Sequence, residues 1–124
     1  MEEHRKYVRI TESLKIGYKV VNPITGPGEC LSKEISAGGI RLSVQQRLAP
    51  GDILELEISL SRSSKPIRAT GEVVWVNEIE GFNLQYMIGI KFIKINPSEG
   101  SKIYNYIWEK IEGKKSDQIG WIDD

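Results

Sequence analysis

Two arginines, Arg5 and Arg9, lie four positions apart in a polar N-terminal segment of this 124-residue chain. A guanidinium group donates two parallel hydrogen bonds to phosphate oxygens or to the O6 and N7 edge of guanine, and its plane stacks on a base. The pair therefore suits a small anionic or nucleotide ligand. Taken alone, the same two arginines equally suit a flexible terminus that carries surface charges.

A second group of residues, 34–40, has the sequence Glu-Ile-Ser-Ala-Gly-Gly-Ile and lies between two expected strands. Gly38 and Gly39 allow a backbone turn with positive φ and the close approach of a ligand to the main chain. Ser36 and the neighbouring backbone amides can donate hydrogen bonds to a phosphate or a base edge. The other interpretation is an ordinary glycine turn in which the serine bonds its own backbone.

Composition limits the classes of partner. The chain has 17 basic and 17 acidic side chains, and this balance argues against a general nucleic-acid binder, so no DNA or RNA partner is expected. The single cysteine, Cys30, excludes an intramolecular disulfide and a cysteine-based zinc cluster. The charged N-terminus lacks the apolar run of a signal peptide, and no stretch approaches the roughly 20 apolar residues that span a bilayer. A cytoplasmic protein without membrane insertion is expected.

Catalytic chemistry has little support in the sequence. His4 is the only histidine and lies in the polar N-terminal segment, so no Ser/His/Asp or Cys/His set can be assembled. Glu55 and Glu57 alternate with apolar residues and fit a solvated strand face. No phosphate-binding glycine loop precedes a helix, and no metal-ligand spacing occurs. The protein is therefore expected not to be an enzyme and to hold neither a metal nor a cofactor.

The central part of the chain alternates apolar and polar residues with the period of two that is typical of half-buried strands. The clearest case is Leu54, Leu56 and Ile58, which alternate with Glu55 and Glu57. Expected strands cover residues 13–20, 29–35, 40–44, 54–60, 67–75 and 88–92. Turns rich in Gly and Pro, such as residues 22–28 and 50–52, separate them. Six short strands of this kind predict a closed or nearly closed antiparallel barrel.

The period changes after residue 97. Ile103, Ile107 and Ile111 recur every four residues, which predicts an amphipathic helix with Ser98 as its N-cap and Gly113 as its stop. This helix is expected to pack on the barrel or to pair with a copy of itself, so monomer and homodimer both stay open. The predicted organisation is an N-terminal arm (1–12), a barrel with its helix (13–112) and a flexible tail (113–124).

Together the two groups of residues resemble the signature of PilZ domains, an Arg-x-x-x-Arg arm followed by [Asp/Asn]-x-Ser-x-x-Gly. Arg5 and Arg9 match the first motif, Ser36 and Gly39 match the second, and Glu34 occupies the Asp/Asn position. The similarity extends over about residues 3–112. Further matching stretches are residues 39–42, 50–52, 71–75 and 88–92, with a helix after the last strand.

The resemblance implies a mainly β protein, a six-stranded antiparallel PilZ-type barrel with a C-terminal helix, that binds the bacterial second messenger cyclic di-GMP. It implies that Arg5 and Arg9 grip phosphates and guanine edges as the arm folds over the ligand. Ser36 would bond a phosphate or guanine, and the glycines Gly38 and Gly39 would permit the turn. The family is also expected to act through a partner protein, which the sequence does not identify.

Four other residues belong to the expected site. His4 precedes the first motif arginine, a position that influences how many ligand molecules bind in the family. Arg41 follows the loop and either neutralises phosphate or is a solvated strand residue. Trp75 lies on the apolar face of its expected strand, which favours core packing, although PilZ tryptophans near this position border the ligand. Glu34 keeps the oxygen acceptor of the family's Asp/Asn but moves it one methylene farther from the backbone, so it can reach guanine or pair with Arg5 or Arg9 and compete with the ligand for them.

The leading hypothesis is a cyclic di-GMP receptor or adaptor that signals by ordering its N-terminal arm and engaging a partner. The first alternative is a divergent PilZ interaction adaptor that binds the nucleotide weakly or not at all, which Glu34 favours. Another is an oligonucleotide-binding barrel, against which the neutral charge counts.

Overall fold

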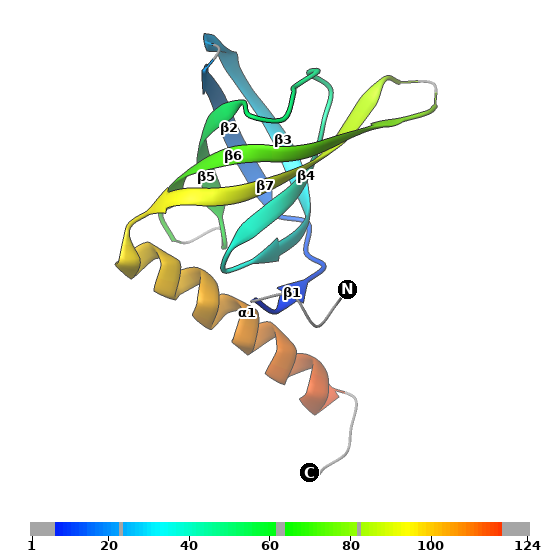
Figure 1. The fold of residues 1–124 in the computed structure, drawn as a ribbon. Coiled ribbons are helices and arrows are strands. Elements are labelled where there is room, and N and C mark those ends of the chain that lie inside the picture. The colour runs from blue at the N-terminus through cyan, green and yellow to red at the C-terminus, as the bar shows by residue number, and fades with distance from the viewer. Residues whose placement is uncertain (1–6, 23, 62–63, 82, 118–124) are drawn as a thin grey trace.

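The computed structural model describes residues 7–22, 24–61, 64–81 and 83–117, and these form strands followed by one long helix (Figure 1). The helix, α1, spans Pro97–Asp117. The strands are β1 (Arg9–Ile10), β2 (Lys15–Asn22), β3 (Ile24–Ser36), β4 (Gly39–Val44), β5 (Ile53–Ser59), β6 (Ile67–Ile79) and β7 (Gln85–Ile95).

Strands β2 to β7 close into a barrel, as the sequence predicted. The pairing order β3-β2-β5-β6-β7-β4 is closed by a further pairing of β3 with β4. All of these pairings are antiparallel. The mainly β class and the six-stranded antiparallel barrel with a C-terminal helix are therefore confirmed.

The alternating pattern explains the inside of the barrel. Leu54, Leu56 and Ile58 of β5 are all buried, whereas Glu55 and Glu57 between them are exposed. Equivalent residues of every strand from β2 to β7 join them in one apolar core. Burial of these side chains is the main stabilising term of a small barrel, because each contributes about 1.5–3 kcal/mol relative to exposure.

Helix α1 covers one end of the barrel, beside β1 (Figure 1). Ile103 and Ile107 are buried in the core, which agrees with the expected apolar stripe. Asn96, and not the expected Ser98, caps the helix. Its side-chain Oδ1 accepts hydrogen bonds from the Ser98 backbone N (3.0 Å) and from the Ser98 hydroxyl (2.9 Å). Pro97 then occupies the first helical position, where a missing N–H costs nothing.

The predicted stop at Gly113 is also wrong, because α1 continues to Asp117. A glycine ends a helix when it adopts a left-handed conformation, and Gly113 is not among the glycines with positive φ in the described residues. Glycine in helical conformation only lowers helix stability by about 1 kcal/mol relative to alanine. The helix can therefore pass through this position.

The chain between β1 and β2, which is the end of the predicted N-terminal arm (1–12), is held by hydrogen bonds to β3 and to α1. The buried Ser32 hydroxyl of β3 donates to the Glu12 carbonyl (2.6 Å) and accepts from the Leu14 backbone N (2.8 Å). The Glu12 carboxylate in turn accepts a hydrogen bond from the Tyr106 hydroxyl of α1 (3.2 Å). Burial, together with the nearby Glu12, raises the pKa of Tyr106 to about 12. Strand β1 is thus anchored both to the barrel and to the helix.

Among the described residues, no helix combines the length and the apolarity that a membrane span needs.

Candidate ligand-binding site

A hollow of about 250 Å³ lies on the outer face of the barrel, against β1, β3, β4, β6 and β7. Every predicted site residue that the structure describes lines it: Arg9, Glu34, Ser36, Gly38, Gly39, Arg41 and Trp75. Two predicted residues, His4 and Arg5, lie outside the described residues. The structure therefore brings the second half of the arm motif and the whole serine–glycine loop to one place.

Strand pairing explains why these residues meet. Arg9 of β1 is opposite Ser36 at the end of β3, and Glu34 of β3 is opposite Arg41 of β4. The arm thus enters the barrel as a short strand beside the loop that joins β3 to β4. Arg9 and Glu34 are therefore in direct contact although they lie 25 positions apart in the sequence.

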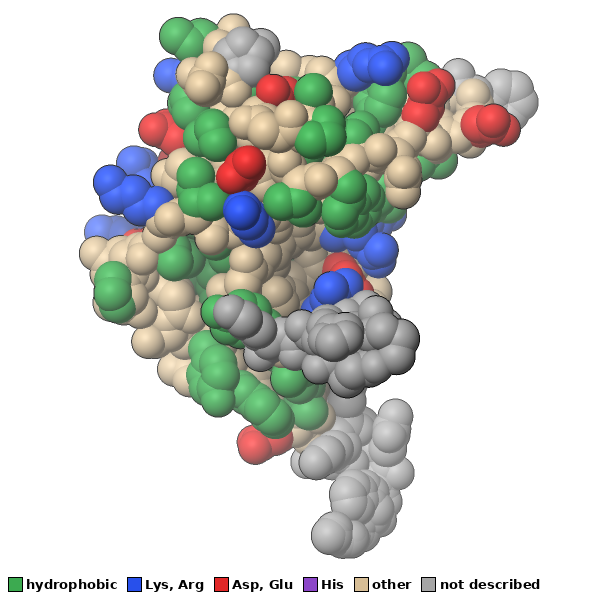
Figure 2. All heavy atoms as spheres, in the orientation of Figure 1, with side chains coloured by type: hydrophobic (Ala, Val, Ile, Leu, Met, Phe, Trp, Pro, Cys, Tyr) green, Lys and Arg blue, Asp and Glu red, His purple; other side chains and the backbone are tan. Residues whose placement is uncertain are grey.

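The carboxylate of Glu34 occupies the centre of the cationic part of the hollow. Its Oε1 accepts a hydrogen bond from Nη1 of Arg9 at 3.3 Å, and Nε of Arg41 lies 3.9 Å from the same oxygen. Figure 2 shows basic side chains beside an acidic one on this side of the molecule. Of the two roles open to Glu34, pairing with an arm arginine is the one seen here. Both side chains of the Arg9–Glu34 pair are partly exposed, so we expect the pair to contribute about 1 kcal/mol or less to stability.

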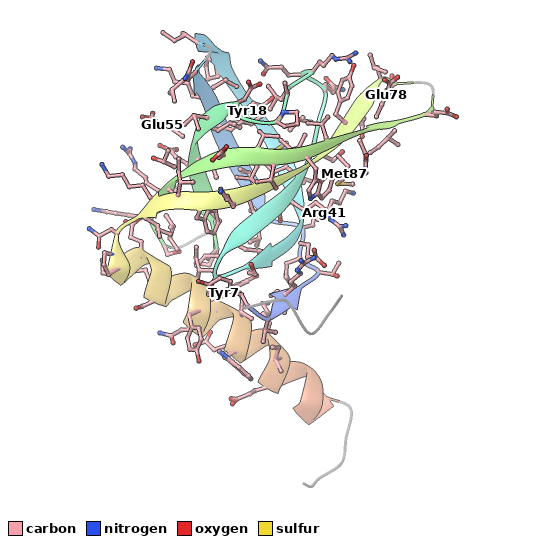
Figure 3. All side chains as sticks on the ribbon, viewed as in Figure 1. Tyr7, Tyr18, Arg41, Glu55, Glu78 and Met87 are labelled. Carbon is pink, nitrogen blue, oxygen red and sulfur yellow. The ribbon has the colours of Figure 1, made fainter. Side chains whose placement is uncertain are left out.

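Arg41, labelled in Figure 3, has an incompletely satisfied guanidinium group. Its Nε is buried but donates no hydrogen bond to the described residues, because Glu34 lies too far away for one. A buried N–H without a partner costs about 1–3 kcal/mol, so an acceptor placed in the hollow would be stabilised there. Arg41 is therefore not simply a solvated strand residue.

The loop between β3 and β4 is ordered by its own serine. The hydroxyl oxygen of Ser36 accepts hydrogen bonds from the backbone N of Gly38 and of Gly39, both at 3.1 Å. The Gly38 carbonyl accepts from the Phe92 backbone N of β7 at 2.9 Å. Ser36 thus bonds the backbone of its own loop, which is the arrangement expected of an ordinary glycine turn. These hydrogen bonds fix the loop at the edge of the hollow.

Gly38 and Gly39 are required by close packing, and the expected positive φ is wrong. Neither has positive φ, whereas Gly51 in the turn before β5 has φ of 97°. A Cβ at Gly39 would collide with the backbone oxygen of Ile90 on β7. A Cβ at Gly38 would collide with the ring of Tyr7. At Gly39 the neighbour is backbone and cannot move aside, whereas at Gly38 it is the half-exposed Tyr7 side chain, which a Cβ would displace.

Trp75 lies at the hollow and not in the core, so the core interpretation is wrong. The pairing of β6 with β7 shifts register between Val73 and Trp75, and this bulge changes which face of the strand the later residues occupy. Val73 is buried, whereas Trp75 is 37% exposed. Its indole lies on Gly89 of β7, where a Cβ would collide with the ring.

The lining residues that the sequence did not indicate include Tyr7 and Lys91, whose side chains can contact a ligand. Tyr7 lies between the two motif arginines, and this position in the sequence could have identified it as a site residue. Lys91 follows Gly89 on the outward face of β7, but alternation alone does not say which strands lie beside it. The Lys91 ammonium lies 3.8 Å from the Glu72 carboxylate. Among the described residues that line the hollow, it joins Arg9 and Arg41 as a third cationic side chain, and Glu34 is the one carboxylate, which favours an anionic ligand.

Solved structures with the same fold are numerous. The inhibitor of motility MotI/DgrA of Bacillus subtilis is 21% identical, with a TM-score of 0.75, over 90% of this chain and 53% of that one. The PilZ domain of YcgR from Escherichia coli with c-di-GMP is 16% identical, with a TM-score of 0.69, over 94% of this chain and 99% of that one. MrkH in the K. pneumonia MrkH–c-di-GMP complex is 16% identical, with a TM-score of 0.73, over 93% of this chain and 56% of that one.

This chain thus spans about half the length of MotI/DgrA and of MrkH. At these identities the likeness shows a shared fold. No curated protein matches the sequence.

The sequence model of the PilZ domain matches residues 3–108, which is most of the chain and includes the arm, the loop and all the barrel strands. The oligonucleotide-binding barrel is therefore wrong as an assignment. Motifs, barrel topology and family match agree, and this chain belongs to the PilZ domain family.

Proposed function

We propose that this protein is a cyclic di-GMP receptor or adaptor and that it acts by binding, not by catalysis. The observation that carries the proposal is the hollow in which Arg9, Arg41 and Lys91 converge beside the Ser36–Gly39 loop. Phosphates would meet the two guanidinium groups, and a guanine edge would meet their parallel N–H donors. The solved PilZ domain of YcgR and the MrkH complex, both with c-di-GMP, support this choice of ligand.

The signalling step that we propose is a rearrangement of the N-terminal arm. Arg5 would join Arg9 on the ligand, so that residues before β1 gain contacts that exist only in the complex. A partner protein would then recognise the bound arm. Amide hydrogen exchange of residues 1–10 measures this directly, and we expect slower exchange when the ligand is present.

The proposal is tested by calorimetric titration at physiological salt. We expect cyclic di-GMP to release heat with saturation in the micromolar range or below. Cyclic di-AMP is the matched control, because it carries the same phosphates without the guanine O6 acceptor and 2-amino donor. Absence of heat with cyclic di-GMP up to high micromolar concentration would exclude the receptor function.

One observation favours a second function, an interaction adaptor of the PilZ fold that binds the nucleotide weakly or not at all. The Glu34 carboxylate already holds Arg9 at 3.3 Å and lies 3.9 Å from Arg41, so it competes with an anionic ligand for both. A ligand must displace this internal anion before it can use the arginines.

Replacing Glu34 with aspartate separates the two functions. Aspartate withdraws the carboxylate by one methylene, which weakens its contact with Arg9 and restores the residue type of the family motif. For a receptor, we expect the variant to bind cyclic di-GMP about tenfold more tightly than the natural protein, the equivalent of one hydrogen bond. Binding that appears only in Glu34→Asp would instead identify the natural protein as the adaptor.

A further inference from the structure

Two aromatic rings at the hollow lie directly against glycines. The ring of Tyr7 lies against Gly38, and the indole of Trp75 lies against Gly89, in both cases so closely that a Cβ would collide with ring carbons. Figure 3 places Tyr7 at the turn between β3 and β4. Each glycine therefore leaves the space that one ring occupies.

The Tyr7 ring is only half covered. Its side chain is 50% exposed although one face rests on Gly38, and the residue lines the hollow together with Arg9. No hydrogen bond joins its hydroxyl to the part of the chain that the structure describes. A tyrosine whose role was to anchor the arm would bury more of its ring. The exposed ring is an apolar platform beside cationic donors.

We propose that Tyr7 is a ligand-binding residue whose ring stacks on one base of the nucleotide, with Gly38 as the residue that positions it. This inference rests on the proposed function. The recognised class is a planar heteroaromatic base linked to a phosphate. The phosphate lies at Arg9 and Arg41, and the base lies on the ring beside the loop. A base on such a ring gains stacking energy whatever its identity, so Tyr7 raises affinity more than it sets guanine specificity.

The first experiment compares three proteins by titration with cyclic di-GMP. Tyr7→Leu keeps an apolar side chain on Gly38 but removes the aromatic face, and we expect about tenfold weaker binding. Tyr7→Phe keeps the ring and is therefore expected to bind at least fivefold more tightly than the leucine variant, which recovers most of the tenfold loss. Equal affinity of the leucine variant and the natural protein would overturn the inference, as would equal loss in both variants.

The second experiment tests whether Gly38 acts through Tyr7. Gly38→Ala should displace the ring and weaken binding by about tenfold in the natural protein. In a Tyr7→Ala background there is no ring to displace, so the same change should then cost less than about twofold, a coupling that a purely structural role of Gly38 would not produce. Equal losses in both backgrounds would overturn the positioning role.

Failure of this inference is distinguishable from failure of the proposed function. If the natural protein does not bind cyclic di-GMP, the receptor function fails. If it binds and the Tyr7 variants bind equally well, only the stacking role fails. Thermal unfolding of each variant, expected within a few degrees of the natural protein, excludes loss of fold as the cause.

Discussion

Alanine at Arg9 is expected to weaken cyclic di-GMP binding by about a hundredfold, which corresponds to roughly 2.7 kcal/mol. Arg9 is the arm arginine that the structure places in the hollow, and strand pairing of β1 with β3 holds it there. Its loss removes charge-assisted hydrogen bonds to the ligand. It also leaves the Glu34 carboxylate with only the more distant Arg41, at 3.9 Å, so a less compensated negative charge would face an anionic ligand.

The measurement is calorimetric titration, with Arg68→Ala as the matched control. Arg68 pairs with Glu57 at 3.3 Å and its side chain is 79% exposed, away from the hollow. Its removal should change affinity by less than about twofold, because such exposed pairs contribute little. An Arg9→Ala protein that binds like the natural one would show that the ligand, if any, lies elsewhere. The fold should survive, since the lost Arg9–Glu34 pair is also partly exposed.

Alanine at Gly39 is expected to lower the free energy of unfolding by on the order of 3 kcal/mol, near the upper end for overpacked sites. The added Cβ would collide with the backbone oxygen of Ile90. That oxygen belongs to β7, which pairs with both β4 and β6, so it cannot move aside without disturbing two pairings. The collision also lies where the hydrogen bond from Phe92 N to Gly38 O holds the loop.

Urea unfolding measures this change, and Gly113→Ala is its matched control. Gly113 is an exposed helical glycine with open space at its Cβ position, so alanine there should stabilise the protein by about 0.5–1 kcal/mol. A loss of stability at Gly39 and a gain at Gly113 for the same substitution would establish that close packing, and not the general properties of glycine, matters at the loop. A loss below about 1 kcal/mol at Gly39 would contradict the packing argument.

The barrel was predictable because a buried face imposes alternation on each strand. Leu54, Leu56 and Ile58 show this pattern without interruption. A bulge removes that information, because one inserted residue transfers everything beyond it to the other face. Trp75 follows such a bulge, and its apparent place on the apolar face of β6 was therefore wrong.

The site was predictable only where residue type and spacing carry it. Arg9, Glu34 and Ser36 have the side chains that the chemistry needs, and they lie in the hollow. The reason for Gly38 and Gly39 was not accessible, since it depends on Tyr7 and Ile90, which approach from distant parts of the chain. Local sequence indicates that a glycine is special but not whether φ or packing requires it.

The predicted ends of the helix were wrong for a related reason. Ser98 and Asn96 are both good capping residues, and only the path of the chain after β7 decides which of them precedes the first helical residue. Gly113 resembles a stop, yet a glycine ends a helix only when the following chain turns away.

Closure of the barrel has a consequence for how other proteins can attach. Many β proteins recruit an extended peptide by pairing it with an unpaired strand edge, and each strand from β2 to β7 has neighbours on both sides for only part of its length or for all of it. Within the described residues, β1 alone ends the sheet order, with β3 on one side only. The strand that carries Arg9 is thus one place where a peptide could pair with the backbone, and the end of β6 is another, because residues 75–79 pair with β7 alone. A peptide added to β1 would lie beside the ligand hollow, so its binding and that of the ligand would be coupled.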